Sequence, residues 1–559
     1  MTAMKVNEVR KIFTGAAAVT AIGSCCSDIS ESPEQPMNII YIMCDDHSYQ
    51  TISAYDRTLT NTPNIDRLCD EGYRFTNSFV ANSLSGPSRA CLLTGKHSHK
   101  NGFTDNRDRI FDGNQTTFPK LLKENGYETA VIGKWHLGSE PVGFSHWDIL
   151  DGQGEYYQPV FICNGDTLLR PGYVTDIITE QTIDWLEKKR DKNKPFCLLV
   201  HHKAPHRSWM PDVCDLGSHD HVEFPLPENF EDNYEGRPAA SLQEMTIEAD
   251  MNTAYDLKIA DKDGALIEPE WKWTLGMYRG GTKEGERLRP GRMDHEQQEV
   301  WNSYYDPIIE DFRKDSLEGK ELAEWKYQRY MRDYCSVIKS VDRNIGHLYE
   351  YLEKEGLLEN TMIIYTSDQG FFMGEHGFFD KRFMYEESFR TPLIVRLPDR
   401  MERKRPGRAE TSVYGPNFGK GDYDISEMVQ NIDIAPTILE YAGVEIPEEM
   451  QGESFLGLMK GTSAQDMKTD TGKGWRDALY YHYYEYPGEH AVRRHYGIRT
   501  ERYSLMHFYH DTDSWELYDL KNDPLQMHNI YHTPEAAIIL PDLMKQLNEL
   551  QMLYEDPIQ

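Results

Sequence analysis

Residues 37–46 read MNIIYIMCDD, and this stretch decides the fold. Its first eight residues are almost all apolar, a pattern typical of a short strand that is buried on both faces of a parallel sheet. The strand runs directly into Asp45 and Asp46. Ligands of open parallel sheets bind beyond the carboxyl ends of the strands. The two aspartates therefore mark a sheet edge at which we expect a functional site.

The same pattern returns further along the chain. Short apolar runs that we interpret as strands occupy residues 128–133, 196–200 and 361–366. Segments with helical spacing lie between them, at residues 63–71, 118–125 and 323–355. Strands that alternate with helices predict an α/β fold, in which a mostly parallel sheet is sandwiched by helices.

The pattern changes from about residue 475. Short aromatic-rich segments at residues 478–486, 495–499, 503–509 and 516–519 read as strands, and residues 534–553 read as a closing helix. This predicts a small antiparallel sheet with one helix packed on it. We therefore expect three parts: a leader and linker over residues 1–36, a main domain over 37–474 and a C-terminal subdomain over 475–559.

Residues 214–310 form an acidic insertion with weak periodicity and several tryptophans. A long irregular insertion in a compact domain is either a functional lid or a region whose pattern is poorly interpreted, and the sequence does not choose between these readings.

The 559-residue chain has a formal net charge of -32. Such a surface repels nucleic acid, and the sequence contains no basic patch interleaved with aromatic residues. An anionic small molecule is also repelled at long range, so any anion site must gather cations locally. No apolar run reaches the roughly 18 residues typical of a membrane-spanning helix.

The first residues have the character of an export signal. Lys5, Arg10 and Lys11 form a positive start, and residues 12–24 are uncharged and rich in Ala and Gly. Cys25 follows at the place where bacterial lipoprotein signals carry the cysteine that becomes lipidated. We expect export to the periplasm or outer-membrane surface of a bacterium, with a lipidated Cys25 as a membrane tether. A plain cleaved signal peptide or an unstructured tail is the alternative.

The chain contains nine cysteines. Without Cys25 and Cys26, seven remain; this odd and scattered set includes no C-x-x-C pair, which argues against a disulfide framework and against a structural zinc site. We expect most of them to be core residues.

Four predicted strands each run into ionisable or polar residues. These residues are Asp45 and Asp46, Lys134 and His136, His206, and Asp368 and Gln369. The Asp and Gln side chains offer only oxygen ligands, which suits a hard cation such as calcium or magnesium. The Lys and His residues, together with Lys381, supply the local positive charge that an anionic ligand requires. Each residue alone could equally be a turn, a helix cap or a solvated side chain.

Residues 85–95 read SGPSRACLLTG. Pro87 is suited to the start of a helix and Gly95 to its end, so Ser85 is expected just before a helix N-terminus, where negative charge is favoured. The alternative is that Ser85 only caps a short helix.

This segment resembles the signature of type I sulfatases in its serine-type variant. The similarity extends over about residues 37–530 and includes GKWHLG at 133–138, APH at 204–206, SDQG at 367–370, GEHG at 374–377 and DIAPT at 433–437. The resemblance implies an alkaline-phosphatase-like fold. It also implies an enzyme whose nucleophile is a formylglycine made from Ser85 by a separate maturation enzyme.

The resemblance also implies a role for each matching residue. Asp45, Asp46, Asp368 and Gln369 are expected to hold one calcium ion, although many relatives carry Asn or His where Gln369 stands. Hydrated formylglycine at position 85 is expected to attack sulfur and form a formylglycine-sulfate intermediate. Arg89 is expected to brace the hydrate, Lys134 and Lys381 to hold sulfate oxygens, His206 to act as general acid and His136 as general base.

The stretches 374–388 and 201–209 are similar to those of bacterial N-acetylglucosamine-6-sulfatases. The expected substrate is therefore the 6-O-sulfate of N-acetylglucosamine in host glycans such as heparan or mucin fragments. Asp380 and Arg382 are candidates for binding sugar hydroxyls, or else form a surface ion pair. His490 or His495, in a His/Arg-rich loop, is expected to touch substrate; the alternative is that this loop carries edge-strand charge that prevents aggregation. The alternatives are another sulfated sugar, a phosphonate or phosphate ester, or a non-catalytic sulfoglycan-binding lipoprotein.

Overall fold

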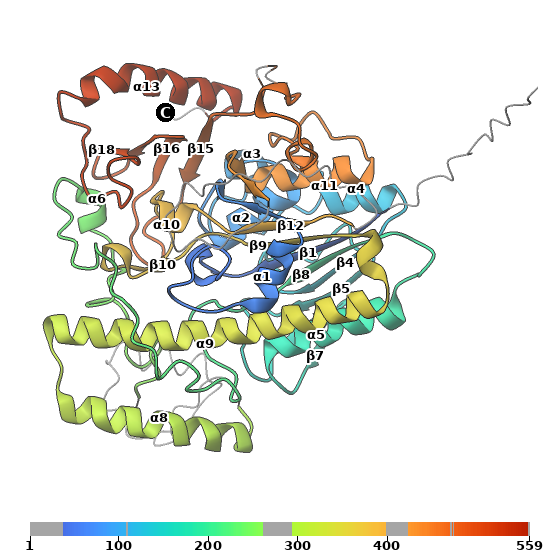
Figure 1. Cartoon of the computed structure of the whole chain (residues 1–559), viewed down its shortest axis with the longest axis horizontal. Coiled ribbons are helices and arrows are strands. Elements are labelled where there is room, and N and C mark those ends of the chain that lie inside the picture. Colours follow the sequence, from blue (N-terminus) through green and yellow to red (C-terminus); the bar gives the residue numbers. More distant parts are fainter. Residues whose placement is uncertain are drawn as a thin grey trace, which may run out of the picture. The chain divides into compact units, whose positions relative to one another are not determined.

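Strand β1 (Asn38–Cys44) lies inside a ten-stranded sheet in the computed structural model, which describes residues 37–107, 110–260, 293–398, 423–469, 472 and 474–556 (Figure 1). The strand order is β13 (Asp424–Ile425), β2 (Tyr73–Phe75), β12 (Leu393–Arg396), β9 (Thr361–Ser367), β1, β8 (Phe196–His201), β4 (Glu128–Gly133), β5 (His146–Leu150), β6 (Val160–Cys163) and β7 (Asp166–Leu169). β1 pairs in parallel with β8 and β9, and β4 pairs in parallel with β8 and β5. The predicted α/β fold is confirmed.

Antiparallel strands extend this parallel centre. β12 pairs antiparallel with β9 and β2, and β5, β6 and β7 form an antiparallel meander at the other edge. Short two-stranded pairs link β3 (Ser78–Phe79) with β14 (Val429–Gln430), and β10 (Phe372–Met373) with β11 (Phe379–Asp380). The sheet is therefore mixed, with its parallel strands in the middle.

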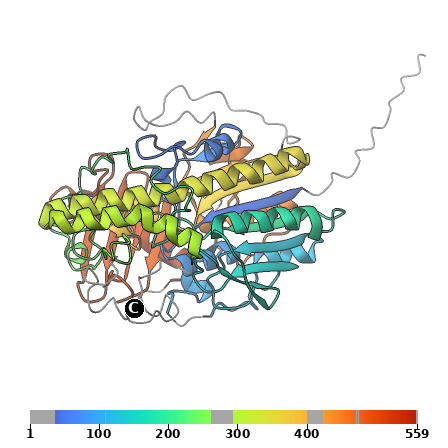
Figure 2. The ribbon, with the colours of Figure 1, turned by 90° about the horizontal axis from the view of Figure 1, so that it is seen from below.

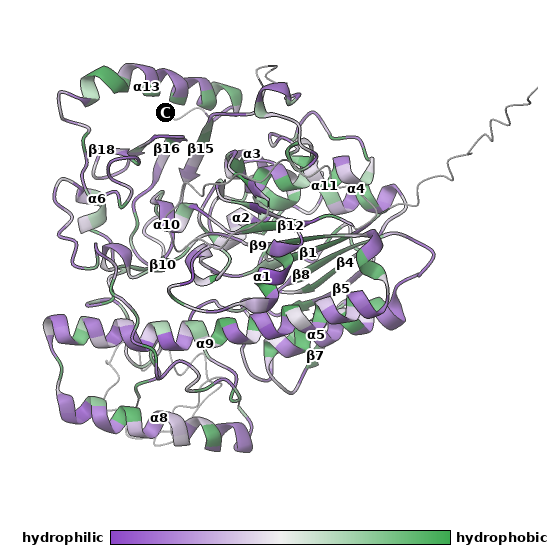
Figure 3. Cartoon of the chain, viewed as in Figure 1, coloured by the Kyte–Doolittle hydropathy of each residue, from purple (hydrophilic) through white to green (hydrophobic). Residues whose placement is uncertain are grey.

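Helices cover both faces of the sheet (Figures 1 and 2). Ile40 and Ile42 of β1 face a core shared with α1 (Pro63–Asp70), α5 (Val174–Asp184) and α9 (Gly319–Lys354). Ile39 and Tyr41 face a second core shared with α2 (Ser85–Thr94), α4 (Phe118–Glu124) and α11 (Ile434–Ala442). Burial on both faces explains the continuous apolar run of residues 37–44. Figure 3 shows the central strands of the sheet as hydrophobic, whereas α9 has hydrophilic and hydrophobic stretches.

Apart from α8 and α13, the remaining α-helices of the described residues are short connections. They are α3 (Ser98–Asn101), α6 (Pro238–Ser241), α10 (Glu386–Phe389) and α12 (Leu456–Met459). No helix in the described part of the chain combines the length and the apolar character that a bilayer span requires.

The C-terminal region has the predicted architecture. An antiparallel sheet contains β15 (Ala478–Tyr483), β16 (His495–Thr500), β17 (Tyr503–Phe508) and β18 (Ser514–Asp519), followed by α13 (Ala536–Leu553). Tyr480 and Ile498 pack with α13, whereas Tyr481 and Met506, on the other face, join the main core. The domain boundary between residues 474 and 475 stays a prediction.

The described part of the insertion contains one long helix and packs on the main core. α8 (His295–Asp315) buries Trp301 and Tyr305 in that core. The preceding residues reach the C-terminal region, because the N–H of Glu244 donates to the carbonyl of His490 at 2.8 Å. The residues of 214–310 that the structure describes are therefore built into the domain, and residues 1–36, with the expected signal and Cys25, lie outside the described residues.

The cysteines of the described residues are all free. Cys44, Cys69, Cys91, Cys197 and Cys335 are buried, as the sequence predicts. Cys163 is half-buried and Cys214 is exposed, so these two are the exceptions among the described cysteines.

Gly133 is expected to tolerate no side chain. It ends β4 with φ of 104°, and a Cβ there would lie 2.0 Å from the carbonyl oxygen of His201. We expect Gly133→Ala to cost at least about 3 kcal/mol of unfolding free energy, because it adds a backbone clash to a left-handed conformation. Chemical denaturation measures this loss. Gly126→Ala is the matched control, since its φ is 89° but its Cβ would meet open space; we expect it to cost about 1 kcal/mol. Equal losses in the two variants would contradict the steric explanation.

Candidate active site

The carboxyl ends of four neighbouring strands bring polar residues to one edge of the sheet. They are Asp45 and Asp46 after β1, Lys134 after β4, His206 after β8, and Asp368 and Gln369 after β9. The adjacency of β4, β8, β1 and β9 confirms that these ends meet.

Asp45, Asp46, Asp368 and Gln369 form a buried group of oxygen-bearing side chains, none more than 1% exposed. The backbone N–H of Asp46 donates to Asp368 Oδ1 at 3.1 Å, and the amide of Gln369 donates to Asp46 Oδ1. Asp46 holds a left-handed φ of 67°, which is uncommon for a residue other than glycine and recurs at functional sites.

Each carboxylate of this group has a cationic partner. The pairs are Lys134 with Asp45, Lys381 with Asp46, and Arg89 with Asp368. Burial raises the pKa of Asp368, but Arg89, Lys134 and Lys381 outweigh it and lower that pKa below its usual value. Burial lowers the pKa of Lys134 well below its usual range. The predicted basic side chains therefore do gather at this edge, each of them paired with a carboxylate.

Two atoms of the oxygen group have no hydrogen-bond partner. Asp46 Oδ2 and Gln369 Oε1 are both buried and unpaired. Burial also raises the pKa of Asp46 to about 7, an effect that a nearby divalent cation would oppose. Three carboxylates and one amide oxygen form a donor set for a hard cation, so these residues fit calcium.

Ser85 is the first residue of α2, which Gly95 ends with φ of 65°. The helix thus begins at Ser85, two residues earlier than the position of Pro87 suggested. Ser85 is 1% exposed, and its hydroxyl donates to Asp45 Oδ1 at 3.0 Å. A group at this position is in contact with the oxygen group and sits in the first turn of a helix, where negative charge is stabilised.

Two histidines lie near Ser85 and the lysines. His206 Nε2 is 3.8 Å from Asp46 Oδ2, while its Nδ1 hydrogen-bonds the carbonyl of Arg207 at 2.7 Å. His136 Nε2 is 3.0 Å from Gln153 Nε2, and its buried Nδ1 has no partner. Burial lowers the pKa of both histidines well below the usual value, and Lys134 lowers it further. Burial therefore favours the neutral form of both rings.

A pocket of about 150 Å³ opens onto this group. Ser85, His206 and Lys381 line it, together with Asp380 and Arg382. Asp380 and Arg382 have left-handed φ values of 75° and 98° and are joined by an ion pair. They are at most 4% exposed, so they form a buried pair in the pocket wall and not a surface ion pair.

The two candidate histidines of the C-terminal region, His490 and His495, differ in their surroundings. His490 Nε2 lies 3.1 Å from Asp380 Oδ2, so it supports the pocket wall from behind. His495 is fully buried; its Nε2 accepts from the N–H of Met384 at 3.1 Å and its Nδ1 donates to the carbonyl of Arg493 at 2.7 Å. His495 is not among the pocket-lining residues, and both of its nitrogens serve the core.

The pocket also contains residues that the sequence analysis missed. Arg207 holds Asp256 of the insertion through two hydrogen bonds, at 2.6 and 3.0 Å, and holds Glu489 at 2.5 Å. Lys203 lines the pocket as well. Their closeness to His206 in sequence was the available signal, but the partners of Arg207 lie far along the chain.

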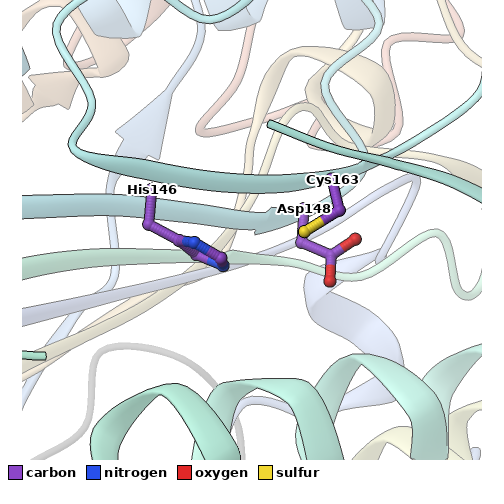
Figure 4. A group of neighbouring side chains, drawn as sticks. All are labelled: His146, Asp148 and Cys163. Carbon is purple, nitrogen blue, oxygen red and sulfur yellow. The ribbon is translucent and has the colours of Figure 1, made fainter. Parts of the chain in front are cut away.

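A second group of metal-ligating types lies on β5 and β6 (Figure 4). His146, Asp148 and Cys163 share a face because His146 and Asp148 are two residues apart and Asp148 pairs with Cys163 across the strands. Asp148 is held by Arg170 at 2.7 Å, and the amide of Asn164 reaches His146 Nδ1 at 3.2 Å. Arg170 therefore neutralises one oxygen of Asp148, whereas His146 Nε2 and Asp148 Oδ1 are buried without a hydrogen-bond partner.

Residues 37–444 match the family model described as sulfatase, and residues 410–553 match one described as N-sulphoglucosamine sulphohydrolase, C-terminal. The chain is 48% identical over 543 residues to an N-acetylglucosamine-6-O-sulfatase of Bacteroides thetaiotaomicron, covering 96% of this chain and 90% of the relative. It is also 24% identical over 587 residues to human iduronate 2-sulfatase, covering 92% and 94% of the two chains.

Solved structures agree with this relationship. One with 48% identity and a TM-score of 0.83 is a complex with its substrate D-glucosamine-2-N,6-O-disulfate, and the similarity covers 93% of this chain and 99% of that one. A phosphonate monoester hydrolase of Agrobacterium radiobacter, at 18% identity and a TM-score of 0.62 with 93% and 96% covered, shares the fold alone. The chain belongs to the sulfatase family and is a sulfuric ester hydrolase.

Proposed function

We propose that this sulfatase removes the 6-O-sulfate of N-acetylglucosamine in host glycans, such as fragments of heparan or mucin chains. The observation that carries the proposal is the position of Ser85. It lines a pocket beside Asp45 and three paired cations, and the same pocket presents the Asp380–Arg382 pair. The similarity to a bacterial N-acetylglucosamine-6-O-sulfatase supports the choice of sugar.

We infer that Ser85 is oxidised to formylglycine by a separate maturation enzyme. The signature at residues 85–95 and the buried position of Ser85 support this inference. The hydrated aldehyde supplies a second hydroxyl, so that sulfate can be expelled without attack by water on an ester. Unmodified serine lacks that route.

Asp45, Asp46, Asp368 and Gln369 would hold the calcium ion, which supplies positive charge next to the sulfuryl oxygens. The unpaired Asp46 Oδ2 and Gln369 Oε1 support this assignment.

The chain's own residues then divide the remaining tasks. Arg89, held by Asp368 at 3.0 Å, is positioned in α2 one turn from Ser85. Lys134 and Lys381 bind sulfate oxygens once their carboxylates take another partner. A bound sulfate ester brings negative charge that raises the pKa of His206, which favours protonation of its Nε2 and donation to the leaving sugar oxygen. His136, with its unpaired Nδ1, accepts the proton when sulfate departs.

The Asp380–Arg382 pair would bind adjacent sugar hydroxyls. A carboxylate and a guanidinium offer an acceptor and a fork of donors that suit such a pair. His490 holds Asp380, and Glu489 approaches Arg382 at 3.4 Å, so the wall is fixed before substrate arrives.

We further propose that the enzyme is exported to the periplasm or cell surface of a bacterium, with Cys25 as its lipid tether. The charged start and apolar stretch of residues 5–24 support export. Incorporation of a labelled fatty acid that is lost in Cys25→Ala would support the tether, and a soluble unlabelled product would refute it.

Sulfate release from a panel of sugars tests the proposed substrate. The panel contains 6-sulfated N-acetylglucosamine, 6-sulfated galactose, 3-sulfated and N-sulfated glucosamine, and an aryl phosphate. Selective release from the first supports the proposal. Selective release from another sulfated sugar would refute the proposed regiochemistry, and preference for the phosphate would favour a phosphate-ester hydrolase.

We expect Arg382→Ala to lower kcat/KM for 6-sulfated N-acetylglucosamine by about 10- to 100-fold, mainly through KM, because a charged hydrogen bond to the sugar is lost. Initial rates over a range of substrate concentrations measure the effect. Arg502→Ala is the matched control, since Arg502 pairs with Asp519 and does not line the pocket. Unchanged kinetics in Arg382→Ala would refute its role in sugar binding.

A further inference from the structure

Lys203 is a buried lysine in the pocket wall whose role the proposed mechanism leaves open. Its side chain is 4% exposed and lines the same pocket as Ser85 and Lys381. Its ammonium donates to the backbone carbonyl of Gln153 at 3.3 Å and lies 5.0 Å from the ring centroid of Tyr156. These neighbours are neutral, so neither compensates the charge.

The other cations that line the pocket all have carboxylate partners. The pairs are Lys381 with Asp46, Arg382 with Asp380, Arg207 with Asp256, and Lys258 with Asp333. Among the described residues, no carboxylate lies within ion-pair distance of Lys203. A buried charge without a partner is costly, and proteins seldom keep one unless a ligand or a function requires it.

Lys203 remains charged under ordinary conditions despite its burial. Burial lowers its pKa to about 8, although Glu155 and Asp46 act in the opposite direction. At neutral pH most molecules therefore present an ammonium to the pocket.

Lys203 is adjacent in the backbone to His206, the expected general acid, and lines the same pocket. It lies three residues before His206, whose N–H donates to the carbonyl of Lys203 at 3.0 Å. Its charge also acts on Lys134 and His206, where it lowers both pKa values. The cation therefore lies within electrostatic range of the groups that handle the sulfate.

We propose that Lys203 is a further substrate-binding residue, whose ammonium binds an oxygen of the 6-O-sulfate group. The inference rests on the proposed function, because it takes the sulfated sugar as the ligand. An anion at this place supplies the partner that the protein does not. The net charge of -32 makes such a cation more important, since long-range attraction cannot concentrate the substrate.

Calorimetric binding to Ser85→Ala protein, kept in calcium, tests the proposal without turnover. The ligands are N-acetylglucosamine, its 6-sulfate, D-glucosamine-2-N,6-O-disulfate and inorganic sulfate. We expect the added change Lys203→Met to lower the affinity for both 6-sulfated sugars by the same factor, about 10- to 100-fold. The affinity for the unsulfated sugar should not change. Inorganic sulfate should also bind more weakly.

Lys258→Met is the matched control, because Lys258 is an equally buried pocket lysine with a partner, Asp333, at 2.8 Å. It should lower the melting temperature but keep the affinity ratio between sulfated and unsulfated sugar. Lys203→Met should raise the melting temperature of the free protein, since an unpaired buried charge is removed.

Three outcomes would overturn the role of Lys203. The first is an equal loss of affinity for sulfated and unsulfated sugars in Lys203→Met. The second is a loss of affinity confined to the N-sulfated ligand, and the third is no loss of affinity for any ligand. Failure of the proposed substrate looks different. In that case the Ser85→Ala parent would not prefer the 6-sulfated sugar, while inorganic sulfate would still bind in a way that depends on Lys203. If the Ser85→Ala parent binds neither the 6-sulfated sugar nor inorganic sulfate, both the proposed substrate and the role of Lys203 are refuted.

Discussion

Ser85→Ala is expected to abolish sulfate release, with kcat lowered by at least about 10,000-fold, as is usual when a covalent nucleophile is removed. The alanine retains the fold because Ser85 makes one side-chain hydrogen bond, to Asp45 at 3.0 Å. It removes the atom that maturation converts and that reacts with sulfur. Ion chromatography of released sulfate measures the effect.

The neighbouring change Ser83→Ala is the matched control. Ser83 is equally buried and its hydroxyl donates to the carbonyl of Ser388 at 3.0 Å, but it does not line the pocket. We expect its kcat to stay within about tenfold of the parent. Mass spectrometry of the tryptic peptide 75–89 should show loss of two hydrogens in the active protein and none in Ser85→Ala. Substantial activity in Ser85→Ala would refute the nucleophile.

Calcium removal is expected to cause the second largest effect. Chelation should lower activity at least about 100-fold and, if calcium is present at 100 times its Kd, should also remove about 2.7 kcal/mol of stability. Without the ion, Lys134 and Lys381 stay paired with Asp45 and Asp46, so the sulfate loses its two lysine ligands. Activity assays and thermal melts across a calcium titration measure both losses, and added calcium should reverse them.

The variant Asp46→Asn distinguishes loss of metal binding from an unspecific effect of chelation on the fold. The amide keeps the size of the side chain but removes a charged ligand, so the variant should have low activity and a melting temperature that no longer responds to chelator. A parent enzyme that keeps full activity after exhaustive chelation would refute the calcium site. Restoration by zinc but not calcium would refute the assignment of a hard cation.

The sequence predicted the parallel centre well because its strands are buried on both faces and so leave continuous apolar runs. β4 has the predicted bounds, and β1, β8 and β9 lie within a residue of theirs. The start of α9 lies at Gly319, four residues before the predicted one, because its first turn is polar and exposed and leaves no apolar period.

The meander of β5, β6 and β7 could not be predicted in the same way. β7 has all four residues exposed, so burial imposes no pattern on it. Patterns of hydrophobicity report burial, and β7 is buried too little to produce one. α8 was missed for another reason: its buried residues Trp301, Tyr305 and Ile309 do recur every four residues, but the acidic, weakly periodic sequence around them hid this spacing.

The site residues at strand ends were predictable because topology alone brings them together. The pocket wall was predictable only in part: Asp380 and Arg382 were candidates, but the Arg207–Asp256 pair depends on how the insertion folds back. His495 shows the opposite error: a titratable residue in a charged stretch suggests a ligand, yet its two nitrogens are satisfied inside an aromatic core.

Because residues of the insertion contact the pocket wall, the reaction chemistry and the recognition of the sugar could change separately during evolution. Reaction chemistry resides at the sheet edge, whereas Asp256 and the carbonyl of Glu244, from the insertion, hold Arg207 and His490 in place. A descendant could exchange the inserted segment and acquire a different sugar while inheriting the ancestral desulfation machinery unchanged. We therefore expect sequence differences among homologues to concentrate in the insertion and not at the sheet edge.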